Sequence, residues 1–142
     1  MYDLKTIKEK VNSFRVLIVD DEELIREGAI IFMKKFCTHV DGAKNGEEAL
    51  KMFTENGPYA IVLTDICMPK MTGWELVKAL KNIDTELFVA VMTGSPEEDG
   101  IFRNSCDMYM AKPINIDKMQ TMLEMIISKR DQHGFGKIID KG

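Results

Sequence analysis

Five short segments with strand-like patterns are spaced along the chain, separated by polar and amphipathic segments, and the first, third and fourth of them are mainly apolar. They cover about Arg15–Val19, Thr38–Ala43, Tyr59–Thr64, Leu87–Met92 and Asp107–Ala111. The third run contains Ala60-Ile61-Val62-Leu63, shows no alternation of apolar and polar positions, and closes on Thr64-Asp65. Such a run is typical of a strand buried on both faces, as in the middle of a parallel sheet. We therefore predict five β-strands.

Segments with helical spacing alternate with these runs. The predicted helices cover about Leu24–Phe36, Glu47–Asn56, Gly73–Asn82, a short segment that ends by Arg103, and Ile116–Lys129. Thr72 and Glu75 have the spacing of a capping box, in which each side chain bonds the other residue's backbone N–H. The apolar side of the first of these helices is predicted to contain Leu24, Ile25, Ala29, Phe32, Met33 and Phe36.

This alternation predicts an α/β fold with a doubly wound, five-stranded parallel sheet, right-handed crossovers and helices on both faces. With five strands the flavodoxin-like order 2-1-3-4-5 fits best. We expect one domain at residues 15–129. Residues 1–14 form an amphipathic extension with roughly helical spacing, and the polar, glycine-containing residues 130–142 are predicted to be a tail or linker.

Composition narrows the classes of function. A chain of 142 residues with 45% apolar residues can bury one core. Its apolar runs are too short to span a membrane and its amino terminus lacks a signal-peptide layout, so we expect a cytoplasmic protein. The three cysteines, Cys37, Cys67 and Cys106, form no CxxC pair and are expected to be reduced. A net charge of −4 argues against direct nucleic-acid binding.

The polar residues that close the predicted strands carry the candidate chemistry. In the predicted strand order, Asp20, Asp21 and Asp65 converge on one crevice, and Thr93 and Lys112 end neighbouring strands at the same edge. Three carboxylates cannot all be ionised there unless a proton or a cation offsets the repulsion. Oxygen ligands without histidine or cysteine favour Mg²⁺. Asp65 is then the natural nucleophile for a phosphoryl group.

Each of these residues alone has a simpler interpretation. Acidic residues after a strand often only complement a helix dipole, a threonine often only ends a strand, and a lysine is usually surface charge. Their joint placement at successive strand ends favours a site.

Residues Arg15–Lys129 resemble the receiver domain of two-component response regulators, the CheY-like superfamily. The resemblance is carried, in order, by VLIVDDE at 16–22, LTDICMP at 63–69, VMTG at 91–94 and YMAKP at 109–113. It implies that Asp65 accepts a phosphoryl group from a histidine kinase or a histidine phosphotransfer protein. It also implies Mg²⁺ bound directly by Asp21, Asp65 and the backbone carbonyl of Cys67, with Asp20 acting mainly through water.

The resemblance assigns further roles near the site. Thr93 would donate a hydrogen bond to the phosphoryl group, Lys112 would pair with it, and Tyr109 would be an aromatic switch. The Lys112–Pro113 peptide bond would be cis. One departure is that the interval from Thr93 to Lys112 is shorter than usual by roughly one helical turn, which predicts a shortened fourth helix that also contains Gly100.

The expected output is a switched protein-interaction surface. The residues after the last helix are too few for a helix-turn-helix unit, so we expect a downstream protein target or an output domain missing from this chain; a phosphorylation-dependent dimer is a further option. The domain would catalyse its own phosphotransfer and slow dephosphorylation rather than turn over a metabolite.

Three alternatives stay open. A receiver-like interaction module could work without phosphate. An FMN-binding flavodoxin-like carrier shares the topology, but the acidic Asp20–Glu23 segment would repel a phosphate. An aspartyl-phosphate phosphatase would carry its nucleophile in a DxD arrangement on the first strand, which Asp20-Asp21-Glu22 does not match.

Overall fold

The computed structural model describes residues 2–94 and 100–141. Its centre is a parallel sheet with the order β2-β1-β3-β4-β5, which confirms the predicted fold class. The strands are β1 (Arg15–Val19), β2 (His39–Ala43), β3 (Ile61–Asp65), β4 (Phe88–Thr93) and β5 (Met108–Ala111). Register pairs link Val19 to Thr64, and Asp65 to Met92. The carboxyl ends of β1, β3 and β4 therefore meet at one edge of the sheet.

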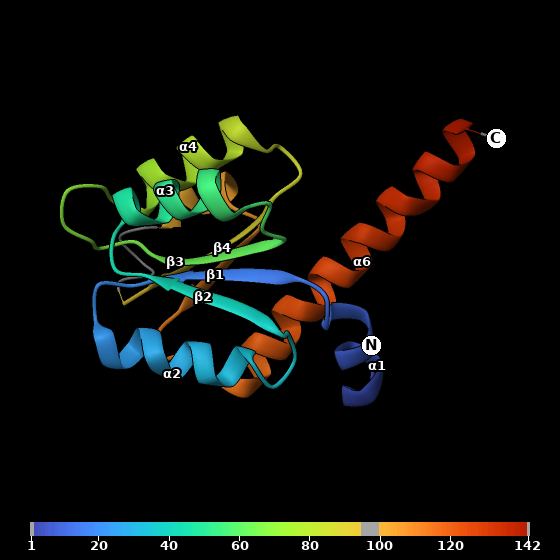
Figure 1. Ribbon diagram of the computed structural model, residues 1–142, viewed down its shortest axis with the longest axis horizontal. Coiled ribbons are helices and arrows are strands. Elements are labelled where there is room, and N and C mark those ends of the chain that lie inside the picture. The colour runs from blue at the N-terminus through green and yellow to red at the C-terminus, as the bar shows by residue number, and fades with distance from the viewer. Residues whose placement is uncertain (1, 95–99, 142) are drawn as a thin grey trace.

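Helices cover both faces of the sheet (Figure 1). On one face lie α3 (Gly46–Asn56) and α4 (Gly73–Ile83), and on the other lie α2 (Glu23–Met33) and α6 (Ile116–Lys141). The apolar residues of each strand alternate between the two sides: Leu17 and Val19 pack toward α3 and α4, whereas Val16 and Ile18 pack toward α2 and α6. Burial on both faces explains why β1, β3 and β4 are largely apolar.

The amino-terminal segment forms helix α1 (Leu4–Val11), with Asp3 as its N-cap. Ile7 and Val11 are fully buried in the core cluster on the α6 side of the sheet. The backbone N–H of Tyr2 donates to Glu124 in α6 at 3.0 Å. Helix α1 therefore packs as part of the body of the molecule, beside α6 (Figure 1).

Several local predictions are confirmed and two are corrected. The capping box of Thr72 and Glu75 begins α4, and the Lys112–Pro113 peptide is cis. The last helix does not end near Lys129 but continues to Lys141, because a glycine in a helix costs only about 1 kcal/mol and no proline stops the chain. In the apolar stripe predicted for α2, Leu24 is 84% exposed and therefore does not belong to the core.

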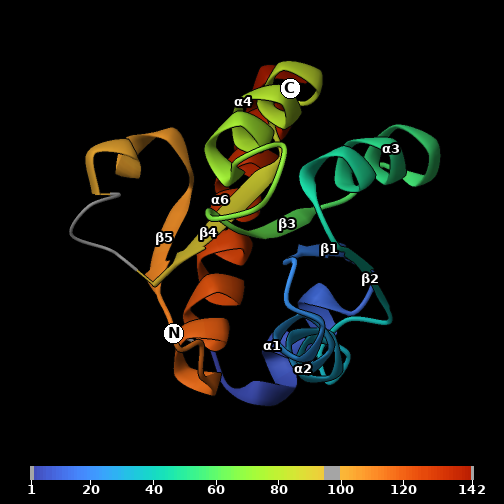
Figure 2. The same ribbon diagram turned by 90° about the vertical axis from the view of Figure 1, so that its left-hand side faces the viewer.

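The fourth connection is short, as predicted. Ser95 and Glu98 also have the spacing that predicts a capping box, and they lie outside the described residues. After them, Gly100–Ser105 form the 3₁₀ helix η1 rather than the end of an α-helix. Segment η1 lies beside β5 at the edge of the sheet (Figure 2). None of the helices in the described ranges is long and apolar enough to cross a membrane.

Asp107, which precedes β5, joins the two helical layers. Its carboxylate accepts from Lys81 of α4 at 2.6 Å, from Lys129 of α6 at 2.8 Å and from the backbone N–H of Val89 at 2.8 Å. We call Asp107, Lys81 and Lys129 the Asp107 cluster. Burial alone would raise the pKa of Asp107, but the two ammonium groups and the N–H outweigh it and lower the pKa below 3.8.

Candidate functional site

The predicted acidic residues come together at the carboxyl edge of the sheet. Asp20 follows β1 and Asp65 ends β3. One carboxylate oxygen from each of Asp20, Asp21 and Asp65 lies within 4.8 Å of the other two. Asp20 and Asp65 are buried, whereas Asp21 is exposed. At this separation two carboxylates repel by about 3 kcal/mol at an effective dielectric of about 20. The arrangement therefore calls for positive charge.

Lys112 supplies part of that charge. Its Nζ lies 3.2 Å from Asp65 Oδ1 and 3.3 Å from Asp20 Oδ2. Burial by itself would lower the pKa of Lys112, but the charges of Asp65 and Asp20 outweigh it and raise the pKa. We call Asp20, Asp21, Asp65 and Lys112 the site cluster. The site cluster contains three carboxylates and one ammonium, so its excess of negative charge favours the binding of a further cation.

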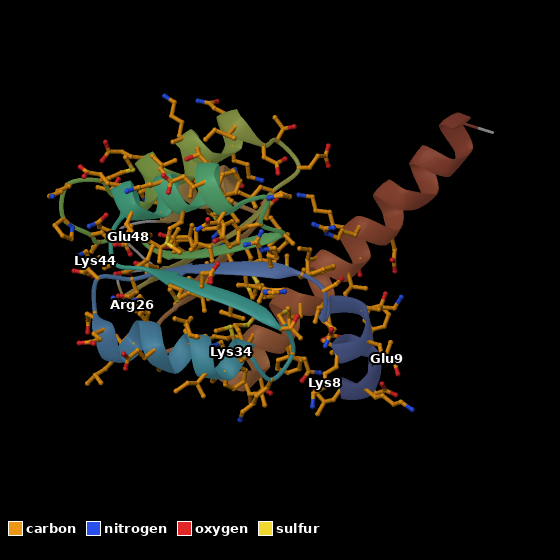
Figure 3. The ribbon with its side chains drawn as sticks, viewed as in Figure 1. Lys8, Glu9, Arg26, Lys34, Lys44 and Glu48 are labelled. Carbon is orange, nitrogen blue, oxygen red and sulfur yellow. The ribbon has the colours of Figure 1, made fainter. Side chains whose placement is uncertain are left out.

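The pKa of Asp65 reflects this excess of negative charge. Burial raises its pKa, the charge of Asp20 raises it further, and Lys112 offsets these effects only in part, so the net shift is upward. Asp20 is held in place by its neighbours: its Oδ1 accepts from the backbone N–H of Glu22 at 2.9 Å, and its carbonyl oxygen accepts from Arg26 at 2.9 Å. Arg26 projects from α2 toward the strands (Figure 3).

Thr93 and Tyr109 lie on the strands next to Asp65. Thr93 is the last residue of β4, is 1% exposed, and is one residue beyond Met92, the register partner of Asp65. The backbone N–H of Lys112 donates to the carbonyl of Thr93 at 2.7 Å, which brings the ends of β4 and β5 together. Tyr109 is half-buried on β5. Cys67, two residues after Asp65, has an exposed side chain, and the role of its carbonyl stays a prediction.

Two residues that support the site were missed by reasoning from the sequence. Lys118, in the first turn of α6, donates to the carbonyls of Ala111 at 2.6 Å and Pro113 at 3.0 Å, and so fixes the segment that carries Lys112. Gly73 lies so close to the end of β3 that a Cβ there would come 2.3 Å from the carbonyl oxygen of Asp65. Lys118 belongs to none of the motifs and gives no signal in the sequence, whereas Gly73, the first residue of α4, could have suggested a close approach of the backbone.

The carboxylate oxygens of the cluster suit a hard divalent cation. Mg²⁺ takes one or two carboxylates and retains several waters, which fits two buried acids with a third exposed to solvent. Neither histidine nor cysteine belongs to the three-carboxylate group found among the described residues. The donor set thus matches the prediction of Mg²⁺ rather than of zinc.

Known proteins with the same architecture and similar sequence were found. The response regulator receiver domain family matches residues 16–124. The transcriptional regulatory protein PrrA of Mycobacterium tuberculosis is 34% identical over 127 residues, which are 84% of this chain and 52% of that protein. Histidine kinase P4 of Formosa agariphila is 29% identical over 136 residues, 90% of this chain and 9% of the kinase.

A solved structure of the response regulator TrrA from Thermotoga maritima, in complex with Mg²⁺ and BeF, is 30% identical with a TM-score of 0.70. It covers 80% of this chain and 98% of the TrrA chain. The chain spans about half the length of several curated response regulators that it matches. Phosphorylation on aspartate and Mg²⁺ binding are typical of this family. The chain belongs to the response regulator receiver domain family of two-component signalling.

Proposed function

We propose that Asp65 is the phosphoacceptor of this receiver domain and that Asp20, Asp21 and Asp65 hold Mg²⁺. The observation that carries the proposal is the site cluster: three carboxylates within 4.8 Å, with Lys112 Nζ 3.2 Å from Asp65 Oδ1. Asp65 ends the central strand and is 5% exposed, so its carboxylate is fixed but within reach of a donor. The Cys67 carbonyl is proposed as a further ligand.

The proposed step is a phosphoryl transfer from the phosphohistidine of a donor protein. A carboxylate oxygen of Asp65 attacks the phosphorus, an O–P bond forms, and the P–N bond to the donor breaks. The leaving imidazole keeps the electron pair and takes a proton from solvent. Lys112 pairs with an equatorial phosphoryl oxygen, and the Thr93 hydroxyl donates a hydrogen bond to another. When bound, Mg²⁺ supplies the remaining positive charge.

The donor is proposed to be a histidine kinase or a histidine phosphotransfer protein that docks beside Lys112. A groove of about 500 Å³ lies there between α2 and the segment that follows β5, lined by Leu24, Ile25, Phe32, Pro113 and Ile114 among others. Its rim includes the exposed side chain of Leu24. An apolar groove that lies next to a reactive site is the kind of surface that a helical partner would cover. This protein would act in the cytoplasm.

The test is intact-mass measurement after incubation with acetyl phosphate and Mg²⁺. We expect the wild-type chain to gain the mass of one phosphoryl group, and Asp65→Asn to gain none. Asp117→Asn is the matched control, because Asp117 is an exposed aspartate in the first turn of α6, and it should react like the wild type. Chelation of Mg²⁺ should stop the reaction in the wild type and in Asp117→Asn.

A different result would favour another function. No mass gain in the wild-type chain, with a natural donor kinase as well as with acetyl phosphate, would reject the phosphoacceptor role and support a module that works without phosphate. Equal labelling of Asp65→Asn and the wild type would move the acceptor to another residue. Output is proposed to pass to a separate protein, to an output domain, or to a second phosphorylated copy; size-exclusion chromatography before and after phosphorylation separates the last from the others.

A further inference from the structure

Trp74 stands between the phosphoacceptor loop and the fifth strand. It is the only tryptophan of the chain, and it lies in the first turn of α4, directly after Gly73. Gly73 is bound to the loop after β3, since its N–H donates to the carbonyl of Ile66 at 2.8 Å. Gly73 also lies against the Asp65 carbonyl with no room for a Cβ. The backbone of Trp74 therefore follows any shift of the segment that carries Asp65.

The side chain of Trp74 reaches across to Tyr109. The two rings are nearly parallel, at 13°, and their centroids are 6.3 Å apart. The guanidinium of Arg103 in η1 lies 5.2 Å from the centroid of the Tyr109 ring. One stack thus joins α4, β5 and η1. We call Trp74, Tyr109 and Arg103 the aromatic stack.

Tyr109 is tied to the other side of the site. It pairs in register with Val91, while Ala111, two residues later, pairs with Thr93. Lys112 is the next residue, and its backbone N–H donates to the carbonyl of Thr93. A change at Thr93 or Lys112 is therefore passed along β5 to Tyr109, and a change at Asp65 is passed through Gly73 to Trp74. The two routes from the site meet at the stack.

We propose that Trp74 is a positioning residue of the switch: it holds Tyr109 and Arg103 in the unphosphorylated arrangement, and phosphorylation separates Tyr109 from it. This inference rests on the proposed phosphorylation of Asp65. Separation of the rings releases η1, because Arg103 loses its place over Tyr109, and it alters a groove of about 430 Å³ that Trp74, Val77, Lys78 and Ser105 help to line between α4 and η1. The surface that changes is therefore the α4–η1 face.

The first experiment uses the emission of Trp74 in the full chain, with intact mass measured on the same sample. Mg²⁺ is added first and acetyl phosphate second, so that the response to the metal is recorded separately. We expect the second addition to change the emission of the wild-type protein in proportion to the phosphorylated fraction. In Tyr109→Leu, the change per phosphorylated molecule should be lost, because the ring that leaves Trp74 is absent.

The second experiment measures amide exchange over residues 100–105 before and after phosphorylation. In the wild type we expect exchange to become faster by roughly threefold to tenfold, which is the value of one aromatic pair. In Trp74→Leu the unphosphorylated protein should already exchange at the faster rate and should not respond further. Trp74→Phe should restore the slow rate and the response, which a general loss of packing would not allow.

The outcomes separate this inference from the function on which it depends. Absence of any mass gain rejects both. Normal phosphorylation with the same emission change in wild type and Tyr109→Leu overturns the inference and leaves the function standing. A full exchange response in Trp74→Leu likewise overturns it.

Discussion

The molecule contains two clusters of aspartate and lysine that use the same groups in opposite proportions. In the site cluster one ammonium faces three carboxylates, and the pKa of Asp65 is raised. In the Asp107 cluster one carboxylate faces two ammonium groups, and the pKa of Asp107 is lowered. Both carboxylates are shielded from solvent, so burial acts in the same direction on each. The ratio of charges decides the outcome.

The difference separates a structural cluster from a reactive one. Two ammonium groups neutralise the charge of Asp107, and its cluster holds α4 and α6 to the sheet. The negative charge around Asp65 is only partly neutralised, and a bound cation would offset the remainder. The following predictions test whether the two clusters differ in this way.

The largest effect is expected for Asp107→Asn. The substitution leaves two partly buried ammonium groups without their carboxylate, and we expect the free energy of unfolding to fall by about 2 kcal/mol at pH 7. Urea denaturation measures it, with the exposed Asp117→Asn as the control, which should change stability by less than about 0.5 kcal/mol. A loss for Asp107→Asn no larger than that of the control would show that the cluster contributes nothing to stability.

Lys112→Met tests the charge deficit of the site cluster. Removal of the ammonium takes away the cation that pairs with the carboxylates of Asp20 and Asp65, so Mg²⁺ should bind more tightly, with a Kd lower by roughly tenfold. Calorimetric titration at constant ionic strength measures the change. Lys118→Met is a useful comparison, because the Lys118 ammonium donates to the carbonyls of Ala111 and Pro113 rather than to the carboxylates and should shift the Kd much less. Weaker binding in Lys112→Met would mean that the lysine organises the metal site rather than competes for it.

Asp65→Asn should act on stability in the opposite direction from Asp107→Asn. In the absence of Mg²⁺, the amide removes one of the repelling charges, and we expect the free energy of unfolding to rise by about 1 kcal/mol. Added Mg²⁺ should stabilise the wild type but not the variant, since a ligand stabilises the state that binds it. Thermal melts with and without Mg²⁺ give both comparisons. Destabilisation by Asp65→Asn in chelator would contradict the proposed deficit.

The two clusters also differ in how far the sequence could predict them. Asp20, Asp65 and Lys112 close strands of a parallel sheet, and the carboxyl ends of such strands meet at one edge, so topology alone brings them together. Lys81, Asp107 and Lys129 share no spacing or motif, and they meet only because α4 and α6 pack on opposite faces at the same end of β5. No sequence pattern predicts that contact.

Helix ends and exposed apolar residues also differ in how far the sequence predicts them. The start of α4 is predictable, because the capping box of Thr72 and Glu75 is visible in the sequence. The end of α6 is not predictable, because glycine only weakens a helix and packing decides whether the helix continues. The spacing of Leu24 identified an apolar stripe in α2, but periodicity does not tell whether another element of the chain covers it.

The smallest and most discriminating effect concerns pH. Asp107 has a lowered pKa in the folded state, so its stabilisation is complete above its unfolded value and is lost only as pH falls through the lower folded value. The pKa of Asp65 is raised, so its unfavourable charge disappears at a higher pH, above 3.8, as the folded protein takes up a proton. As pH falls from neutral toward the ordinary pKa of an aspartate, in chelator, the advantage of Asp65→Asn over wild type should therefore shrink, while the deficit of Asp107→Asn stays constant. Urea denaturation at each pH compares the three proteins, and titrations common to all of them cancel. If the deficit of Asp107→Asn shrank first on acidification, the ratio of charges would not be what distinguishes the two clusters.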